Sequence, residues 1–274
     1  MVLRRMAVAA VVLVGLVATT GASAQTRPGT VALKVRVTGL GTVSVTGGAS
    51  FTCREYPCIH TFHVQSGQRV VVKASAKKGW KLTKWAGACT GSAAKCSYRA
   101  TGWRTVLVTF VPPGAWQNPY PPGTPVTLEG GWRVKVNSAQ INANAEVEAV
   151  VDPYTGDHPN PAPPAGYQYA LVNLSLKSVQ PMSVDVADFL TQLSQLGAAE
   201  KTGSLYPADL YPSDACQPPE PDLGWAGQVT EGQTLRGNLC YLIPSAAAST
   251  LRLDGIATSR QNGAPPPIVW FALR

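Results

Sequence analysis

Glycine and proline interrupt this chain so often that long helices are disfavoured along its whole length. The 274 residues include 26 Gly and 23 Pro. Proline breaks helices and central strands, and both residue types favour tight turns. A hydrophobic share of 45% is too high for a disordered chain and sufficient for a packed core. We therefore expect an all-β protein of short strands and turns, and neither a coiled coil nor a polytopic membrane protein.

The first 24 residues have the three parts of a secretory signal peptide. Arg4 and Arg5 precede an apolar run over residues 6–17, and Ala22-Ser23-Ala24 forms a small-x-small cleavage site. The apolar run is shorter than the roughly 20 residues that a bilayer-spanning helix needs. We predict cleavage after Ala24, no transmembrane segment in the mature chain, and a protein that is extracellular or associated with the cell envelope.

The cysteines indicate disulfides rather than a metal site. An exported chain with an even number of cysteines favours disulfides, and all six fall after the predicted cleavage site. Zinc sites repeat close ligand pairs, and no such repeat is present here. We expect no metal and no cofactor. Local pairing is favoured because each close pair could bridge the two arms of one hairpin, which gives Cys53 with Cys58, Cys89 with Cys96, and Cys216 with Cys240.

A proline-rich stretch over residues 112–123 marks the expected domain boundary. It contains five Pro and two Gly, a composition typical of a semi-rigid extended linker. The charges change at the same place. Residues 25–111 hold 13 Lys and Arg against the single acid Glu55, a net +12, whereas residues 112–274 hold 8 basic and 14 acidic residues, a net −6. We expect two domains, 25–111 and 124–274, of opposite charge.

The N-terminal domain has the alternation of a small sheet. Residues 31–37 place Val and Leu on one face and Lys34 and Arg36 on the other, the pattern of a half-buried strand. Residues 42–45, 69–74 and 106–110 are further predicted strands. The large candidates for the core are Trp80, Leu82 and Trp85. Two disulfides would stabilise a domain this small.

Residues 31–111 resemble the divergent InlB B-repeat family, small all-β modules of bacterial surface and secreted proteins. The ordered landmarks are Gly39-x-Gly41-Thr-Val, Cys53 and Cys58, Gly67-Gln-x-Val-Val-Val-x-Ala, Gly79-Trp-x-Leu-x-x-Trp-x-Gly-x-Cys89, Cys96 and Val106-x-Val-x-Phe110. The resemblance implies a β-grasp-like or related β-rich module with a spacer or adhesive role, and it implies no catalysis. The large basic excess is not part of that family's pattern.

The C-terminal domain has the pattern of a β-sandwich. Alternating or apolar segments at 132–136, 167–176, 234–243, 251–253 and 268–273 are separated by Gly and Pro turns. Residues 188–196 fit either a short helical turn or a strand.

Residues 123–273 resemble the exported DUF4352 domains, which are similar to an immunoglobulin-like fold. The landmarks are Gly123-Thr-Pro-Val, Trp132-x-Val-x-Val, Pro163-Pro-x-Gly-Tyr-x-Tyr169, Cys216, Gly232-Gln-x-x-x-Gly-Asn-Leu-Cys240-Tyr-x-Ile-Pro-Ser245 and Trp270-Phe-Ala-Leu. The resemblance implies export and an immunoglobulin-like sandwich, with no established activity. It also suggests that a Cys216–Cys240 bridge ties a loop to a strand.

Motifs of known catalytic chemistry are weak or missing in the sequence. His60 and His63 are three residues apart, a spacing that puts them on opposite faces of a strand. His158 belongs to a proline-rich loop. The motif Ser92-x-x-Lys95 and a distant Lys201-Thr202-Gly203 match a serine acylase pattern, but that chemistry needs the serine at a helix N-terminus. The chain has no P-loop or H-E-x-x-H motif, and its acids follow no calcium-loop spacing.

The basic residues of the N-terminal domain are the best functional candidates. We predict a polyanion-binding surface made of Lys34, Arg36, Arg69, Lys73, Lys77, Lys78, Lys81 and Lys84. The partner would be an anionic envelope polymer or glycan, with no sequence-specific reading of nucleic acid. The leading hypothesis is a non-catalytic, secreted or envelope-associated binding or adhesion protein. The alternatives are a surface that only aids solubility, a secreted hydrolase with a site in the sandwich loops, and a structural spacer.

Overall fold

A computed structural model describes residues 29–46, 50–54, 58–179, 181, 184–186, 197–199, 205–207, 216–223, 226–256 and 268–274. The predicted signal peptide at 1–24, the acid Glu55, the undecided stretch 188–196 and the Lys201-Thr202-Gly203 motif lie outside these residues.

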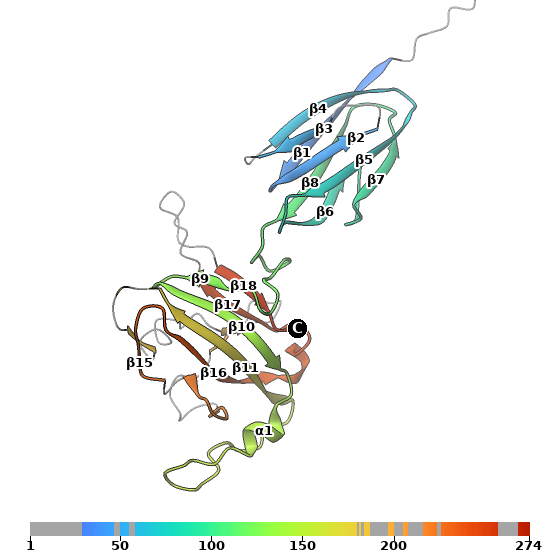
Figure 1. The fold of residues 1–274 in the computed structure, drawn as a ribbon. Coiled ribbons are helices and arrows are strands. Elements are labelled where there is room, and N and C mark those ends of the chain that lie inside the picture. The colour runs from blue at the N-terminus through green and yellow to red at the C-terminus, as the bar shows by residue number, and fades with distance from the viewer. Residues whose placement is uncertain are drawn as a thin grey trace, which may run out of the picture.

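The N-terminal domain, here called the basic module (residues 29–111), is built from two four-stranded sheets (Figure 1). The first sheet has the order β4-β1-β8-β6 and the second has the order β3-β2-β5-β7. The strands are β1 (Thr30–Thr38), β2 (Gly41–Val45), β3 (Ser50–Cys53), β4 (Cys58–Gln65), β5 (Arg69–Ala76), β6 (Lys81–Gly87), β7 (Lys95–Arg99) and β8 (Arg104–Val111). Strands β1 and β8 are parallel, and the other pairs are antiparallel.

The two sheets of the basic module enclose one hydrophobic core. Alternate residues of β1 and β5 point into it, among them Val35 and Val72, which are fully buried. Trp85 is buried in the same core, whereas Trp80 and Leu82 pack at its margin. The predicted alternation is confirmed, and the described part of the module contains no helix. The described residues of the module are therefore β-rich and lack the helix of a β-grasp.

The three predicted disulfides form, each with a Cα–Cα distance of 5.7 or 5.8 Å. The reason given for the local pairing needs correction, because none of the three bonds bridges the two arms of one hairpin. Cys89 follows β6 of the first sheet and Cys96 lies in β7 of the second sheet, and these two strands are not paired. Cys53 ends β3 in the second sheet and Cys58 begins β4 in the first sheet, so their bond joins the two sheets rather than the arms of one hairpin. Cys216 precedes β15 and bonds to Cys240 in the middle of β16, so it ties a loop to a strand.

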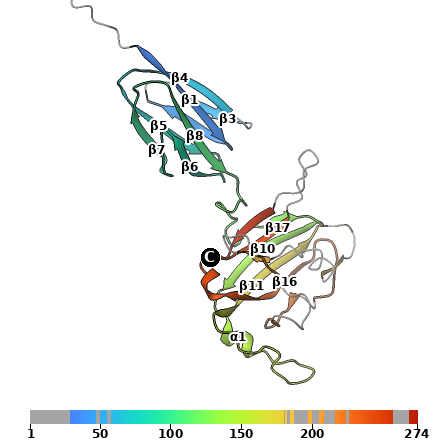
Figure 2. The ribbon, with the colours of Figure 1, turned by 180° about the vertical axis from the view of Figure 1, so that it is seen from behind.

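The proline-rich segment 112–123 is hydrogen-bonded to the C-terminal domain. The Trp270 amide donates to Gly114 O at 2.7 Å, and the Tyr120 amide donates to Trp270 O at 2.8 Å. Tyr120 also forms a parallel bridge with Phe271 in the last strand of the chain. On the other side, the Asn118 side-chain amide donates to Gly79 O at 2.8 Å in the basic module. The segment therefore contacts both domains (Figures 1 and 2).

The C-terminal domain, here called the sandwich (residues 124–274), has two four-stranded sheets of order β16-β11-β10-β9 and β14-β13-β17-β18, and a two-stranded sheet β12-β15. Its elements are β9 (Val126–Leu128), β10 (Trp132–Gln140), α1 (Asn144–Glu148), β11 (Tyr167–Ser178), β12 (Val184–Asp185), β13 (Gly197–Ala199), β14 (Leu205–Pro207), β15 (Gln228–Val229), β16 (Thr234–Pro244), the 3-10 helix η2 (Ser245–Ala247), β17 (Arg252–Ile256) and β18 (Ile268–Ala272). With one short α-helix among the described residues, the all-β prediction is confirmed.

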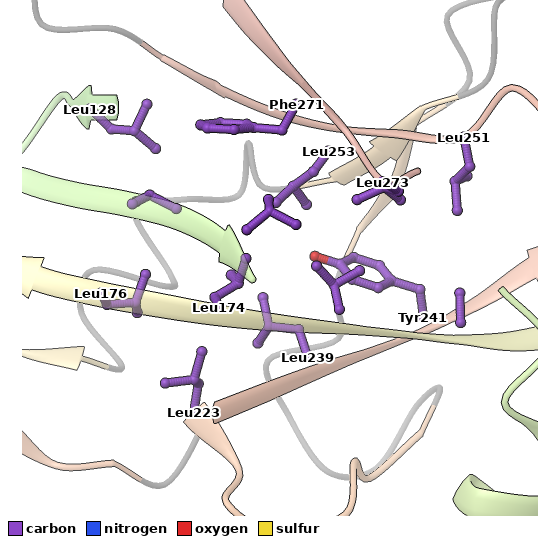
Figure 3. Packing of buried hydrophobic residues seen from close by; sticks show 14 of the residues in the cluster. Leu128, Leu174, Leu176, Leu223, Leu239, Tyr241, Leu251, Leu253, Phe271 and Leu273 are labelled. Atoms are coloured by element: carbon purple, nitrogen blue, oxygen red, sulfur yellow. The ribbon is translucent and has the colours of Figure 1, made fainter. Parts of the chain in front are cut away.

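The sandwich core lies between its two larger sheets. Figure 3 shows Leu174 and Leu176 of β11 directed toward Leu253 and Phe271 of the opposite sheet. Tyr241 is fully buried in this core, and burial together with the charge of Asp254 raises the pKa of its phenol. The other face of β11 is also covered, because Tyr169 packs with the Cys216–Cys240 disulfide and α1 in a second, smaller cluster. Among the described residues, no helix is long and apolar enough to cross a membrane.

Candidate functional site

The eight predicted cations of the polyanion-binding surface do not lie on one face. Lys34 and Arg36 point outward from β1 in the first sheet. Arg69 and Lys73 point outward from β5 in the second sheet, on the opposite side of the module. Each predicted pair therefore shares a face, and the two pairs face away from each other.

The remaining four predicted cations lie at the edges of the module. Lys77 and Lys78 follow the end of β5, and Lys81 and Lys84 belong to β6, which is the edge strand of the first sheet. All four side chains are exposed. Of these four, Lys77 is the one that continues the outward row of β5.

The second sheet adds two cations that the sequence prediction left out. Lys95 and Arg99 point outward from β7, where Lys95 pairs with Lys73 and Arg99 pairs with Arg69 across the strands. These four residues, Arg69, Lys73, Lys95 and Arg99, are called the basic face. The alternation Lys95-x-Ser97-x-Arg99 could have predicted a strand with an outward basic side. Which strand it pairs with could not be read from local sequence.

The basic face places like charges directly opposite each other, an arrangement that destabilises a sheet. The Arg69 Nη2 group donates to Ser97 Oγ at 3.1 Å, and no carboxylate of the described residues pairs with the four cations. The only acid between residues 25 and 111 is Glu55. The described part of the protein therefore holds four positive charges close together without an acidic partner.

The spacing of the basic face follows from strand geometry. Arg69 and Lys73 are four residues apart on β5, which separates their Cα atoms by about 13 Å, and β5 and β7 run about 5 Å apart. The cations therefore form two parallel rows along the strands. Lys77 lies a further four residues along the chain, just beyond the end of β5.

A groove of about 480 Å³ lies where β3 and β5 of the second sheet end and β2 begins, beside Lys77. Its polar lining comes from Thr42, Thr52 and Ser75, and its cations are Arg54 and Lys77. The hydroxyl oxygens of Thr42 and Thr52 are hydrogen-bonded to each other at 3.0 Å. Arg54 is a third cation that the sequence prediction did not select, because it follows a short strand and has no periodic neighbour.

One large aromatic side chain is exposed near the opposite end of the basic face. Trp103 is 65% exposed in the loop between β7 and β8, where it follows Arg99 and immediately precedes Arg104. On the first sheet, Ile59 and Leu107 are 52% and 37% exposed and stand on either side of Arg36 across the strands. The outer face of the first sheet is therefore more apolar than the basic face.

The histidines of the basic module lie as their spacing predicts, on opposite faces of β4. His60 stacks on Phe51 with ring centroids 4.9 Å apart. It also forms a T-shaped contact with Phe62, with ring centroids 4.6 Å apart. His63 is exposed and pairs with Ala32 across β1. Stacking on an aromatic residue accounts for His60 without a metal ion.

Ser92 is not placed for the acylase chemistry that its motif matches. It lies at a bend in the loop between β6 and β7, and not at the start of a helix. Lys95 is directed outward on β7 as part of the basic face. The motif therefore does not have the helical geometry that would bring its lysine beside its serine.

In the sandwich, a groove of about 440 Å³ is lined by Glu146, Glu220 and several Pro and Val residues. A hydrogen bond from the Gln140 side chain lowers the pKa of Glu146. Glu220 Oε2 accepts a hydrogen bond from the Asp222 amide at 3.0 Å. His158, outside this groove, has Nδ1 3.1 Å from Val150 O. Among the described residues, no group of three His, Cys, Asp or Glu side chains could hold a metal ion.

At the domain junction, Trp116 packs between two residues of the sandwich. Its ring meets Trp270 edge-on at 4.8 Å, and the Arg252 guanidinium lies 4.3 Å from its centroid. Burial lowers the pKa of Arg252. This contact has a structural role, because it fixes the proline-rich segment on the outer face of β17 and β18.

Fold and site together define an all-β protein in which a strongly basic, disulfide-bonded module precedes a sandwich. No protein-family model matches the chain, and no curated protein matches it. Among solved structures, it is similar to the crystal structure of a conserved hypothetical protein from Bacillus anthracis, with 12% identity over 56% of this chain and 95% of that chain and a TM-score of 0.32. Similarity at that level does not bear on function.

Proposed function

We propose that this protein is a non-catalytic binding protein that acts outside the cytoplasm and attaches to an acidic polysaccharide of the cell envelope through the basic face. The observation that carries the proposal is the pair of like-charged contacts across β5 and β7, Arg69 with Arg99 and Lys73 with Lys95. A linear polyanion lying along these strands would neutralise both rows of cations, and it would release its own counterions.

A surface that only aids solubility explains the face less well. Lysine on an edge strand blocks aggregation, and β7 is an edge strand of the second sheet. Strand β5, in contrast, is paired on both sides, with β2 and β7. Lys73 therefore protects no free edge, because both pairings reach it, whereas the pairing with β2 starts at Val72 and Arg69 is paired only with Arg99 of β7. The repulsion of Arg69 by Arg99 and of Lys73 by Lys95 costs stability and has a use only when an anion is bound.

The chemistry around the cations favours a polysaccharide over a nucleic acid. Apart from Val71, the outward neighbours on the second sheet are hydroxyl side chains, among them Ser44, Ser97 and Thr42. Proteins that bind single-stranded nucleic acid stack successive bases on several aromatic side chains. The basic face has one exposed indole near its end, Trp103, which could contact a sugar ring.

The disulfides support a location outside the cytoplasm. Structural disulfides form and persist in oxidising compartments, and this chain has three. The predicted signal peptide points to the same place. The proposed envelope location rests on these two features together.

The alternative of a secreted hydrolase would use the groove of the sandwich that Glu146 and Glu220 line together. Glycoside hydrolysis needs one carboxyl group with a raised pKa as the general acid. The pKa of Glu146 is lowered by its hydrogen bond with Gln140, and Glu146 is exposed. The groove therefore lacks, at Glu146, the proton donor that this reaction requires.

Chromatography of the full-length chain on an immobilised acidic polysaccharide tests the proposal. The variant Arg69→Gln/Lys73→Gln should elute at clearly lower salt than the unmodified protein. The control Lys34→Gln/Arg36→Gln removes the same charges from the opposite sheet and should elute close to the unmodified protein. Equal shifts for the two variants, or no retention of the unmodified protein, would sink the proposal.

A further inference from the structure

The groove beside Lys77 is built where three strands of the second sheet end together. Thr52, Thr42 and Ser75 stand directly opposite one another on β3, β2 and β5 and form one row of hydroxyl groups. The next row is Cys53, Gly41 and Ala76, all small residues. Because successive residues of a strand point to opposite faces, Cys53 and Ala76 pack against the core, and the hydroxyl row lines the groove on the outer face of the sheet.

Two cations flank the open end of this groove. Arg54 follows β3 and Lys77 follows β5, so they lie on either side of β2 with about 10 Å between their strands. Each cation comes two positions after the hydroxyl residue of its own strand, with one residue between them, so it has the same outward direction as the hydroxyl row. Within the described residues, no carboxylate pairs with either cation. Both side chains are long enough to reach a single anionic group between them.

The backbone around the groove is held in place on both sides. Cys53, which precedes Arg54, is bonded to Cys58 in the other sheet. The Lys77 amide donates to Leu40 O at 3.1 Å, which fixes the first residue after β5 to the turn between β1 and β2. The groove is therefore formed before any ligand binds, and binding would cost little reorganisation.

We propose that this groove is a binding site for one sugar residue that bears a carboxylate or phosphate group. Arg54 and Lys77 would bind the anionic group through charge-assisted hydrogen bonds. Thr42, Thr52 and Ser75 would exchange hydrogen bonds with the sugar hydroxyls. Leu40, which also lines the groove, offers an apolar contact to the carbon face of the ring.

The groove lies next to the basic face. The inference rests on the proposed function in one respect, because the sugar residue in the groove would belong to the polymer that the basic face binds. Arg69, Lys73 and Lys77 recur every four residues along the outward side of β5 and beyond its end. A linear polymer that follows this row would place one of its units in the groove. The basic face supplies attraction without selectivity, and the groove selects the chemistry of one unit.

Titration of the full-length chain with glucuronic acid and with glucose 6-phosphate, at constant ionic strength, tests the groove by NMR. Amide shifts around Thr42 and Ser75 should saturate with at least one of the two sugar acids. Glucose alone and inorganic phosphate alone should bind at least about tenfold more weakly, because each lacks one half of the recognised groups. Comparison of the two sugar acids decides between carboxylate and phosphate.

Two variants of equal charge separate the groove from general electrostatics. Arg54→Gln/Lys77→Gln should weaken binding of the sugar acid by about tenfold or more, because two charge-assisted hydrogen bonds are lost. Lys34→Gln/Arg36→Gln changes the net charge equally and lies on the other sheet, away from the groove. It should leave binding of the sugar acid within about twofold, because exposed charges at that distance are screened by salt.

A third variant examines the hydroxyl row with little risk to the fold. Thr42→Val removes a hydroxyl while keeping a β-branched side chain in β2. It should weaken binding of the sugar acid by about fivefold. An unchanged affinity in this variant and in R54Q/K77Q would overturn the groove site, as would equal binding of inorganic phosphate and the sugar acid.

The outcomes distinguish this inference from the proposed function. If R69Q/K73Q loses retention on the polysaccharide column and no sugar acid binds the groove, the groove site fails and the basic face stands. If a sugar acid binds the groove but the column retains no protein, the basic face fails and the groove stands.

Discussion

At the scale of single residues, the turn between β1 and β2 depends on a glycine. Gly39 has a φ of 84°, in the left-handed region that favours glycine. A Cβ atom at this position would overlap the carbonyl oxygen of Phe110 and come within 2.7 Å of the Trp80 ring. Gly67 has a similar φ of 80°, but no atom lies within 4 Å of the place that its Cβ would take. A substitution at Gly67 therefore introduces backbone strain alone, whereas a substitution at Gly39 introduces both backbone strain and steric overlap.

We expect Gly67→Ala to lower the free energy of unfolding by about 1 kcal/mol, the cost of a left-handed backbone in an L-residue. Gly39→Ala should cost about 3 kcal/mol or more, because overpacking against Phe110 and Trp80 adds to the same strain. Denaturant unfolding of both variants measures the difference. Equal losses would contradict the close packing of this turn against β8.

Residue by residue, the alternation in the sequence predicted which side chains point inward. Val35 and Val72 are buried, and Lys34 and Lys73 point outward, as the period of two requires. Trp103 was not predicted as an exposed aromatic, because a tryptophan flanked by turn residues has no periodic neighbours that reveal its direction. Exposure of such a residue depends on the loop conformation.

At the scale of elements, the disulfides differ in how far apart their two cysteines lie in the sequence. Cys53 and Cys58 are 5 residues apart, whereas Cys216 and Cys240 are 24 residues apart. A longer closed loop restricts the unfolded chain more, so the longer disulfide should contribute more stability. It also fixes the smaller cluster around Tyr169 on the outer side of β11.

Replacing Cys216 and Cys240 with alanine should lower the free energy of unfolding of the sandwich by about 3.5 kcal/mol. Replacing Cys53 and Cys58 should cost the basic module about 2 kcal/mol, because the closed loop is shorter. Differential scanning calorimetry of the full chain can follow both transitions. A larger loss for the shorter disulfide would contradict this order and would indicate that its connection between the two sheets matters more than loop length.

Most strands could be predicted from local pattern, but their partners could not. The residues of β1, β5 and β8 alternate clearly, whereas the pairing of β5 with β7 joins residues more than 20 positions apart. That pairing creates the contacts of Arg69 with Arg99 and Lys73 with Lys95. The sequence therefore predicted two residues of the basic face, Arg69 and Lys73, and missed the other two, Lys95 and Arg99. The groove was not visible, because it needs the ends of three strands to lie together.

At the scale of the whole molecule, the charge is divided between the two domains. The sequence predicted both this division and the proline-rich segment 112–123, because composition alone determines them. Composition did not predict that the segment hydrogen-bonds to β18 or that Trp116 packs on Arg252. A proline-rich sequence indicates extended backbone, but the partner of that backbone depends on which sheet edge is free.

The central claim is that the basic face is the contact with an acidic polysaccharide. Its most direct test is the dependence of the association constant on salt, measured by calorimetry for the full-length chain and for a variant with Arg69, Lys73, Lys95 and Arg99 all changed to glutamine. The slope of log K against log salt concentration should become shallower by about 3, because four ionic contacts are lost. An unchanged slope in the variant would contradict the claim.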